Sequence, residues 1–503
     1  MVDNTRWWAL AAVTVSVLAA GLGGTVVVVA LPVLARELHA TQSDLVWFQT
    51  IYLLVMAVAV LPIGLVGDWI GRKRVTVVSL LVFGTASTVC AFATSVEQFM
   101  IGRVLQGLSA AGITVMAMSA LIVMFDDDER PKAVGIYQAA NFVALPLGPI
   151  LGGWMLSKFW WGWVFLINVP VVLIAIVACC LIVPESRADE RPGLDPAGTL
   201  ASVVGLTVFV YGLIRAGDDG VTPVVALALI GGVCTLSWFV YWERRLGRRP
   251  NGRPLISPSL LTSRTFMGGA LLAGLAGMAM IGVLLTMPQY FEGVQGEDVL
   301  TSGMRLLPLI VGMVVGSASA GPVAQRMGAR STVTVGFLAL AAGLAWGVTT
   351  GPGSSSTYIG GWMTLVGLGT GLTMSAATAV ALSGLTKERS GTESAVVQAL
   401  NKTSGPLGTA VMGSVVVAVY HARLDVSGLS ESAAAAARSS LFDALAIADE
   451  SGASELADAA GTAFVDGLRV ALMVSATIAV VGAIGARILL PSRRQQNAMT
   501  DNR

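Results

Sequence analysis

Fourteen long apolar runs constrain the fold of this 503-residue chain more than any other feature. A helix that crosses a bilayer needs about 20 mainly apolar residues, and the breaks between these runs are polar or contain Gly and Pro. The runs lie at approximately 7–31, 45–66, 75–94, 99–124, 133–155, 164–183, 197–214, 221–242, 266–288, 302–324, 331–349, 358–383, 394–420 and 467–490. We expect an all-α integral membrane protein, because helices satisfy their own backbone polar groups inside lipid.

The composition excludes several classes of function. Only 12% of the residues are charged and 55% are hydrophobic, whereas soluble domains carry about 25% charged residues. This argues against a soluble enzyme, a disordered protein and a nucleic-acid-binding protein. The chain contains no Gly-x4-Gly-Lys-(Ser or Thr) sequence, so we expect no ATP binding. Its four Cys and two His show no metal-ligand spacing, and we expect no cofactor and no metal site.

The distribution of basic residues predicts the orientation. With the N-terminus in the cytoplasm, 22 of the 31 Lys and Arg residues fall on the cytoplasmic side and 7 fall outside. The positive-inside rule therefore places both termini in the cytoplasm, as an even number of spans requires. The longest loop, 421–466, then lies outside and is rich in Ala and Ser. Segments such as 432–448 are candidates for short helices in this loop.

An internal repeat organises the spans. The sequence Gly-x3-(Asp or Gln)-x2-Gly followed by basic residues occurs at Gly64–Lys73 and again at Gly321–Arg330, eight spans later. The spacing predicts a first six-helix bundle in residues 1–186, two inserted helices in 187–262, and a second six-helix bundle in 263–503. Parallel repeats of this kind are typical of secondary transporters whose substrate site lies between two bundles.

The first copy of the repeat, Gly64…Asp68…Gly71-Arg72-Lys73, combines small residues with charge. Gly64 allows close helix approach, and Gly71 permits a tight turn. Asp68 is placed to accept hydrogen bonds near a helix start, where the helix dipole favours an anion. The alternative interpretation is a plain basic loop that only sets the topology.

Two further motifs lie inside spans. Arg103, Gln106 and Gly107 fall at i, i+3 and i+4 of the fourth span, on one helix face. An arginine there must face protein or water, unless it reaches outward to the membrane surface. The fifth span carries a set of small and kinking residues, namely Gly135, Gly148, Pro149, Gly152 and Gly153. This set favours either a bendable helix at a bundle interface or simple tight packing.

Taken together, these motifs resemble those of the major facilitator superfamily, and in particular its fourteen-span drug–proton antiporter branch. The resemblance covers nearly the whole chain. It implies that Asp68 pairs across the bundles and steadies the outward-facing state, and that Arg103 is tied to proton movement. It also implies that the Gly135–Gly153 pattern marks exchange rather than uptake. Trp69 and Ala144 depart from the usual residues of these motifs.

The resemblance also suggests residues for the cavity and for the coupling proton. Candidates for the cavity are Trp47 and Tyr52 in the second span and Gln398 and Lys402 in the thirteenth. The acids in or near the membrane are Asp44, Glu292 and Glu393. Together with Arg103 and Gln106, they are the candidates for proton coupling. Each acid is equally interpreted as a solvated carboxylate at a helix end.

The leading hypothesis is a proton-coupled exporter of small amphipathic compounds such as antibiotics, dyes or a producer's own metabolite. We expect it to act as a monomer in the cytoplasmic membrane of a bacterium, with the substrate, protons and lipid as its partners. The main alternative is a transporter of lipids or metabolites with the same fold, including one that works by uptake. An enzyme would need a polar catalytic cluster within the spans, and the sequence provides none.

Overall fold

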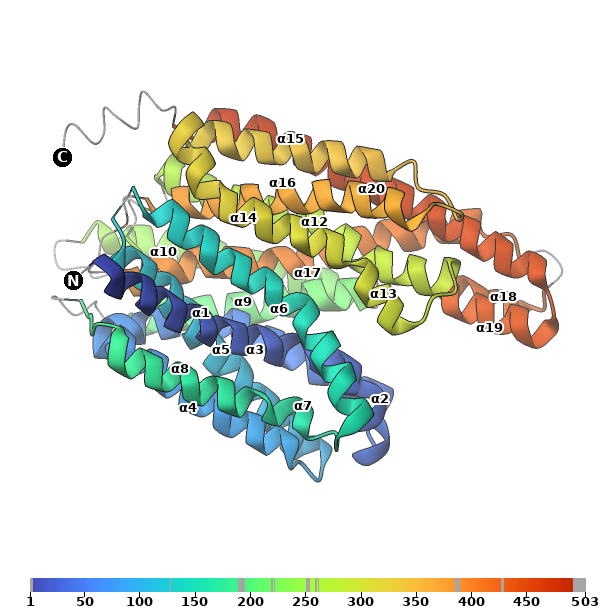
Figure 1. Cartoon of the computed structure of the whole chain (residues 1–503), viewed down its shortest axis with the longest axis horizontal. Coiled ribbons are helices and arrows are strands. Elements are labelled where there is room, and N and C mark those ends of the chain that lie inside the picture. The colour runs from blue at the N-terminus through green and yellow to red at the C-terminus, as the bar shows by residue number, and fades with distance from the viewer. Residues whose placement is uncertain are drawn as a thin grey trace.

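The computed structural model describes residues 3–126, 128–188, 195–218, 220, 222–249, 254–257, 260, 262–383, 385, 390–426 and 429–491. Fourteen helical segments in these ranges have the length and apolar composition needed to cross a membrane. The fold is therefore the all-helical membrane architecture that the apolar runs predict. Its long axis, horizontal in Figure 1, follows the direction of the helices.

Breaks within several spans produce more helices than spans. The first six spans are formed by α1 (Asp3–Thr25) with α2 (Val27–Glu37), α3 (Gln42–Ile70), α4 (Arg72–Ala91), α5 (Val96–Met124), α6 (Arg130–Lys158), and α7 (Trp163–Leu166) with α8 (Asn168–Ile182). The next two are α9 (Pro196–Asp218) and α10 (Pro223–Gly247). The last six are α12 (Arg264–Gln289) with the π-helix η1 (Tyr290–Val294), α13 (Val299–Arg305) with α14 (Leu307–Met327), α15 (Ala329–Gly347), α16 (Ser356–Leu382), α17 (Ser390–Arg423) and α20 (Ser454–Leu489).

The long loop near the C-terminus is more helical than the sequence suggested. Helix α17 continues to Arg423 and α20 begins at Ser454, so both reach into the 421–466 segment. Between them lie α18 (Glu431–Ser439) and α19 (Leu441–Ser451). Ser430 and Ser440 cap these two helices through their side-chain oxygens. A serine cap satisfies amide groups that the helix itself cannot.

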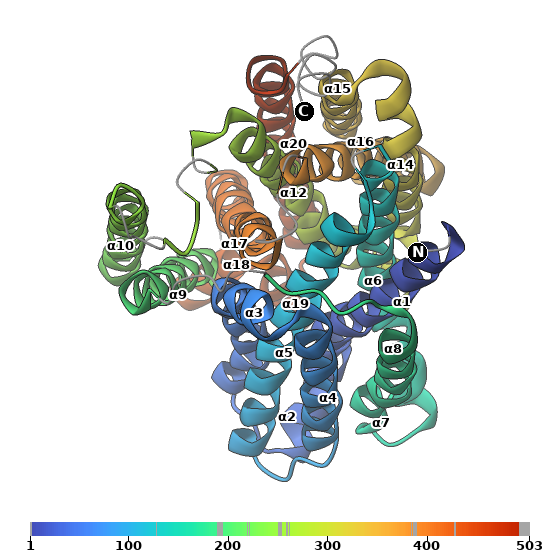
Figure 2. The same cartoon turned by 90° about the vertical axis from the view of Figure 1, so that its left-hand side faces the viewer.

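Two hydrophobic cores underlie the two groups of helices. One buried cluster is drawn mainly from residues 9–183, and the other mainly from residues 272–490. In the end-on view of Figure 2, α1 to α5 and α8 form the lower group and α12, α14, α15, α16 and α20 the upper one. Helices α6 and α17 lie where the groups meet, and α6 packs against α14 and α16.

The inserted pair lies beside the seam between the two groups. Helix α9 packs against α3 from the first group and against α17 from the second, whereas α10 packs mainly on α9. Helix α10 stands at the edge of the molecule in Figure 2. Its side chain Leu227 is 71% exposed, as expected for a helix that faces lipid on most of its surface.

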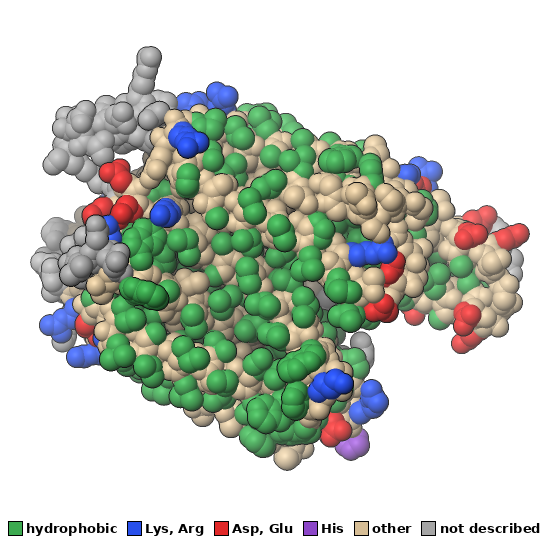
Figure 3. Space-filling model, viewed as in Figure 1, with side chains coloured by type: hydrophobic (Ala, Val, Ile, Leu, Met, Phe, Trp, Pro, Cys, Tyr) green, Lys and Arg blue, Asp and Glu red, His purple; other side chains and the backbone are tan. Residues whose placement is uncertain are grey.

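The two ends of the molecule differ in shape. We call the end at which α3 meets α4 the basic end, and the end that carries α18 and α19 the loop end. At the loop end the ribbons of α2 and α7 separate from those of α13, α18 and α19 (Figure 1). The space-filling view in Figure 3 shows a hollow between these two lobes and apolar side chains along the sides of the molecule. At the basic end the two groups are in contact.

Candidate functional site between the two bundles

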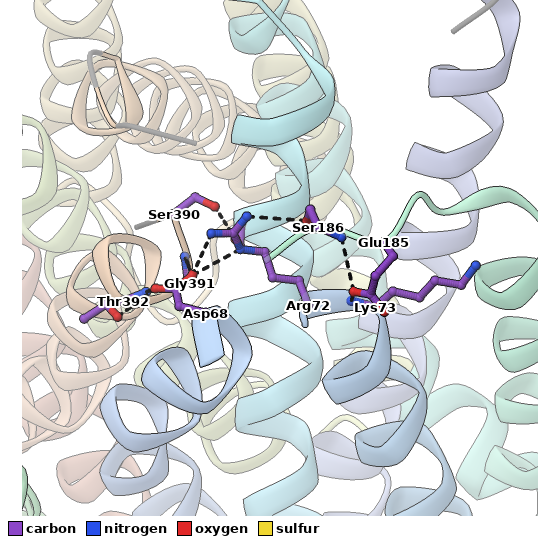
Figure 4. A network of polar contacts seen from close by, with 9 residues as sticks. Asp68, Arg72, Lys73, Glu185, Ser186, Ser390, Gly391 and Thr392 are labelled. Atoms are coloured by element: carbon purple, nitrogen blue, oxygen red, sulfur yellow. Dashed lines mark hydrogen bonds and ion pairs between the residues drawn. The ribbon is translucent and has the colours of Figure 1, made fainter. Parts of the chain in front are cut away.

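The turn between α3 and α4 carries the predicted loop motif (Figure 4). Gly71 joins the two helices with φ of 120°, a backbone conformation that side chains with a Cβ rarely adopt. Asp68, in the last turn of α3, is fully buried, and the Arg72 side chain is nearly so. The Arg72 Nη2 atom lies 2.7 Å from Asp68 Oδ1. The aspartate charge is thus balanced within its own motif.

Asp68 also reaches across to the second group of helices. Its carboxylate accepts hydrogen bonds from the backbone nitrogens of Gly391 at 2.9 Å and Thr392 at 2.8 Å. The Thr392 hydroxyl donates a third bond at 2.8 Å. These donors lie in the first turn of α17, where the helix dipole is positive and stabilises an anion. We refer to Asp68, Arg72, Gly391 and Thr392 as the Asp68 latch.

Glycine allows the backbones to meet at the latch. A Cβ atom added at Gly64 would lie 2.7 Å from Ala395 Cβ and 2.8 Å from the Gly391 carbonyl oxygen. One added at Gly391 would lie 2.5 Å from Asp68 Oδ1. These distances are too short for a side chain, so the closed contact between α3 and α17 depends on both glycines.

The other basic residue of the motif binds within the first group. Lys73 donates from Nζ to the Cys180 carbonyl oxygen of α8 at 2.7 Å, and its backbone nitrogen donates to Glu185 at 3.3 Å. The Arg72 backbone nitrogen donates to the Ser186 carbonyl oxygen at 2.9 Å. The motif therefore ties α4 to the chain after α8 while Asp68 holds α17.

Arg130 forms a second connection at the basic end, one that the sequence analysis did not select. Its side chain is buried and donates to the Leu382 carbonyl oxygen at the end of α16 at 3.1 Å. It also donates to the Phe125 carbonyl oxygen, just after α5, at 3.1 Å. A cation favours the C-terminal ends of helices, where carbonyl groups lack partners. In the sequence, Arg130 directly follows the acidic run 126–129, so it is easily interpreted as part of a charged loop.

The second copy of the repeat has the same turn but weaker contacts. Gly328 between α14 and α15 has φ of 82°. Gln325 is exposed and donates to the Asp128 carbonyl oxygen at 3.2 Å. A Cβ atom added at Gly321 would lie 2.8 Å from Lys132 Cα in α6. The repeat thus places α14 against α6 as it places α3 against α17.

Arg103 lies within the first group of helices and is completely buried. It donates to the carbonyl oxygens of Phe48 at 2.8 Å and Gly23 at 2.9 Å, and to Gln106 Oε1 at 2.7 Å. Its guanidinium lies over the Tyr52 ring at 4.5 Å. Among the described residues, no carboxylate forms an ion pair with it. The arginine joins α1, α3 and α5 rather than extending to the membrane surface.

The glycines of α6 have three different surroundings. Gly135 faces the second group, since an added Cβ would lie 2.4 Å from the Ser317 carbonyl oxygen of α14. Gly148 and Gly152 face α1 and α2, where added Cβ atoms would collide with Thr25 and Val29. Gly153 has nothing within 4 Å of an added Cβ. Pro149 lies between the two glycines that contact α1 and α2.

Gln398 and Lys402 lie on one face of α17, four residues apart. Gln398 is buried and donates from Nε2 to the Tyr137 hydroxyl of α6 at 2.8 Å. Lys402 is half-buried, and none of the described residues is recorded as a partner of its ammonium group. It lies twelve residues after Ser390, about 18 Å along the helix, near the middle of a hydrocarbon core about 30 Å thick.

The two candidates from the second span lie elsewhere, with Tyr52 buried and Trp47 half-buried. The Tyr52 hydroxyl donates to the Ala20 carbonyl oxygen at 2.7 Å, inside the first group. Trp47 stacks on Tyr211 of α9, with ring centroids 6.4 Å apart. Tyr52 therefore supports Arg103, and Trp47 holds the inserted pair against α3.

The three candidate acids lie at different depths. Asp44 forms a capping box with Thr41 at the start of α3, at the loop end, where its Oδ2 accepts from the Thr41 nitrogen at 2.9 Å. Glu292 is half-buried in the π-helix η1. Glu393 is buried in the first turn of α17, directly after the latch residue Thr392. Only Glu393 lies in the contact at the basic end.

The chain is similar to known proteins in sequence and in fold. A family model described as "Major Facilitator Superfamily" matches residues 13–409. The puromycin resistance protein pur8 of Streptomyces alboniger is 31% identical over 86% of each chain. The tetracenomycin C resistance and export protein of Streptomyces glaucescens is 33% identical over 81% of this chain and 75% of its own. A crystal structure of the human organic anion transporter MFSD10 superposes with a TM-score of 0.65 at 13% identity, covering 96% of this chain and 99% of that one.

Proposed function

Because this chain belongs to the major facilitator superfamily of membrane transporters, we propose that it exports small amphipathic compounds by proton-coupled alternating access. Its family and relatives are transporters, not enzymes. The observation that carries the proposal is the Asp68 latch, which joins the two bundles at the basic end while a hollow separates them at the loop end. Export requires this contact to open so that a compound can enter from the cytoplasm.

The proposed orientation places the basic end in the cytoplasm, with both chain termini on that side. The concentration of Lys and Arg supports it. Cysteines introduced at Ser430 in the long loop and at Arg248 after α10, both exposed, provide the test in a background without native cysteines. In intact cells an impermeant maleimide should label Ser430→Cys only. Labelling of Arg248→Cys alone would reverse the orientation.

In the proposed cycle, the contacts of α17 with α3, α5 and α6 break together. Opening separates Asp68 from the start of α17 and Gln398 from Tyr137, so the face that carries Gln398 and Lys402 becomes accessible from the cytoplasm. Glu393 is the acid we select for the coupling proton, because it is covered in the closed contact and uncovered when the latch opens. Arg103 holds α1, α3 and α5 of the first bundle together during this movement.

The proposed substrates follow from the relatives and from the chain itself. One relative is a puromycin resistance protein, and the other is a tetracenomycin C resistance and export protein. Among the described residues of α17, Lys402 offers a cation and Gln398 an amide within the membrane-spanning part of the interface. We therefore propose neutral or singly charged amphipathic compounds as substrates.

The decisive experiment uses purified protein in proteoliposomes with an imposed pH gradient. We expect flux of puromycin or tetracenomycin C that depends on the gradient and stops when a protonophore removes it. Flux of lipids or simple metabolites in place of antibiotics would favour the alternative substrate class. Antibiotic flux that persists without the gradient would contradict proton coupling.

A further inference from the structure

Two carboxyl groups are buried together at the basic end of the inserted pair, outside the site described above. Asp195 directly precedes α9 and is 6% exposed, and Glu243 near the end of α10 is 0% exposed. The segment 254–257, which leads from the inserted pair toward α12, packs beside them, and its residues Leu255 and Ile256 are also buried. None of these residues takes part in the Asp68 latch.

The two carboxyl groups point toward the same residue, Gly198 of α9. A Cβ atom added at Gly198 would lie 2.3 Å from Asp195 Oδ2 and 2.5 Å from Glu243 Oε1. The two oxygens therefore lie over one glycine, close to each other. A side chain at position 198 would collide with both carboxyl groups, so the contact of the two acids over α9 depends on this glycine.

The hydrogen bonds of this pair leave one oxygen without a partner. Asp195 Oδ2 accepts from the Trp242 indole nitrogen at 2.8 Å. Glu243 Oε2 accepts from the Ile256 backbone nitrogen at 3.1 Å. Glu243 Oε1 is buried and has no hydrogen-bond donor among the residues that the structure describes. A buried carboxylate oxygen without a donor is costly, and this one faces a second carboxyl group.

Among the described residues, no basic side chain forms an ion pair with either acid. Arg244 and Arg245 on α10 and Arg264 at the start of α12 are exposed, and the described residues form no ion pair with Asp195 or Glu243. On the neighbouring helices α3 and α17, Asp68 is paired with Arg72, and Glu393 is the remaining acid near that end. The charged group that acts on Glu243 is Asp195 itself.

We propose that Asp195 and Glu243 share one proton taken from the cytosol and form a proton-binding site that holds the linker 254–257 to α10. Two like charges in a buried site cannot both be ionised at low cost. A proton between Oδ2 and Oε1 removes one charge and gives Glu243 Oε1 its missing hydrogen bond. Glu243 Oε2 remains free to hold the Ile256 amide. At alkaline cytosolic pH both groups ionise, their repulsion separates them, and the linker is released.

Infrared difference spectra of the full-length protein in lipid nanodiscs provide the test. We compare neutral with alkaline pH for the wild type, Asp195→Asn, Glu243→Gln and the control Glu455→Gln, which replaces an exposed acid on α20. We expect a protonated-carboxyl band at neutral pH that is lost in both pair variants and kept in the control. A band unchanged by both pair variants, or absent from the wild type, overturns the proposal.

Thermal unfolding gives an independent measurement. The amide of Glu243→Gln can donate to Asp195 as the shared proton would, so this variant should fold normally. We expect its melting temperature to stay constant between neutral and alkaline pH, whereas that of the wild type falls. A wild-type melting temperature that rises with Na⁺ or K⁺, with the effect lost in Glu243→Gln, would assign the site to a metal cation and overturn the proposal.

Discussion

The two copies of the loop repeat share a backbone geometry but differ in what they bind. Both have a glycine with positive φ at the helix junction, Gly71 and Gly328, and both bring a helix of one bundle against a helix of the other. Asp68 in the first copy is buried, paired with Arg72, and bonded to three donors of α17. Gln325 in the second copy is exposed and makes one hydrogen bond across the interface.

The glycine spacing gives both copies the same backbone turn, whereas the buried charge of Asp68 makes the contact of the first copy the stronger one. A buried ion pair that caps a helix is strongly destabilised when one partner is removed, whereas an exposed amide bond contributes little. At the basic end, the contact between α3 and α17 is therefore stronger than the contact between α6 and α14. On the α6–α14 side, close packing at Gly135 and Gly321 carries most of the contact.

Among these variants, Asp68→Asn should have the largest effect on transport and on the balance of closed and open states. Loss of the charge leaves Arg72 buried without its anion and weakens the bonds to α17, at a cost of about 3 kcal/mol, or roughly a 100-fold change in the balance of closed and open states. We expect transport to fall sharply while the amount of protein in the membrane is unchanged. Electron-spin distance measurements between labels at Arg74 and Met327 should report an opened basic end. Normal transport by this variant would show that the Asp68 latch is not needed for transport.

Gly64→Val should have the next largest effect, because its side chain would collide with α17. Overpacking costs about 1 to 3 kcal/mol in the closed state, which corresponds to a shift of roughly 5-fold to 150-fold toward the open state. The matched control is Gly153→Val, which enters open space in α6. The same spin labels should show opening for Gly64→Val and none for the control. Equal effects of the two variants would mean that general helix damage is responsible.

Lys402→Glu tests whether selectivity for substrate charge is independent of the Asp68 latch. The position lies near the membrane midplane, far from both copies of the repeat, so the balance of states should be unchanged. Reversing the charge should favour cationic over anionic substrates by several-fold, since like charges repel in a site of low polarity. Resistance profiles normalised for membrane protein provide the measurement. A loss of protein without a change in substrate ranking would mean that Lys402 is a structural residue.

Gln325→Ala should have the smallest effect. The side chain is exposed and loses one hydrogen bond, which is worth about 0.5 kcal/mol or less at such a position. Transport and the spin-label distances should match those of the wild type. A defect comparable to that of Asp68→Asn would show that the two sides of the basic end contribute equally, contrary to the comparison.

The sequence predicted the features that depend on local pattern. Apolar run length predicted the spans, and the spacing of Gly64, Asp68 and Gly71 predicted a charged turn between α3 and α4. The partners of Asp68 on α17 lie more than 300 residues away, and only the resemblance suggested a contact across the bundles. Asp44 is different, because Thr41-x-x-Asp44 is itself a capping-box pattern and could have indicated a helix cap.

Several residues could not be identified because their roles arise only from packing. Arg130 binds the ends of two helices from different bundles, and nothing in its neighbourhood indicates this. Tyr137 gains its importance by accepting a hydrogen bond from Gln398. Trp47, which was expected near the cavity, lies against α9 instead. The sequence patterns of the two bundles do not indicate where the inserted pair packs, so this contact could not be predicted.

The position of α9 has a consequence for how compounds reach the interface from the bilayer. Helix α9 packs against both α3 and α17, so it covers the seam between the bundles on that side. On the opposite face, α6 and α14 meet with no other described helix in front of them (Figure 1). In the proposed transport cycle, we therefore expect compounds dissolved in the lipid to reach the interface from the α6–α14 side, which α9 leaves uncovered.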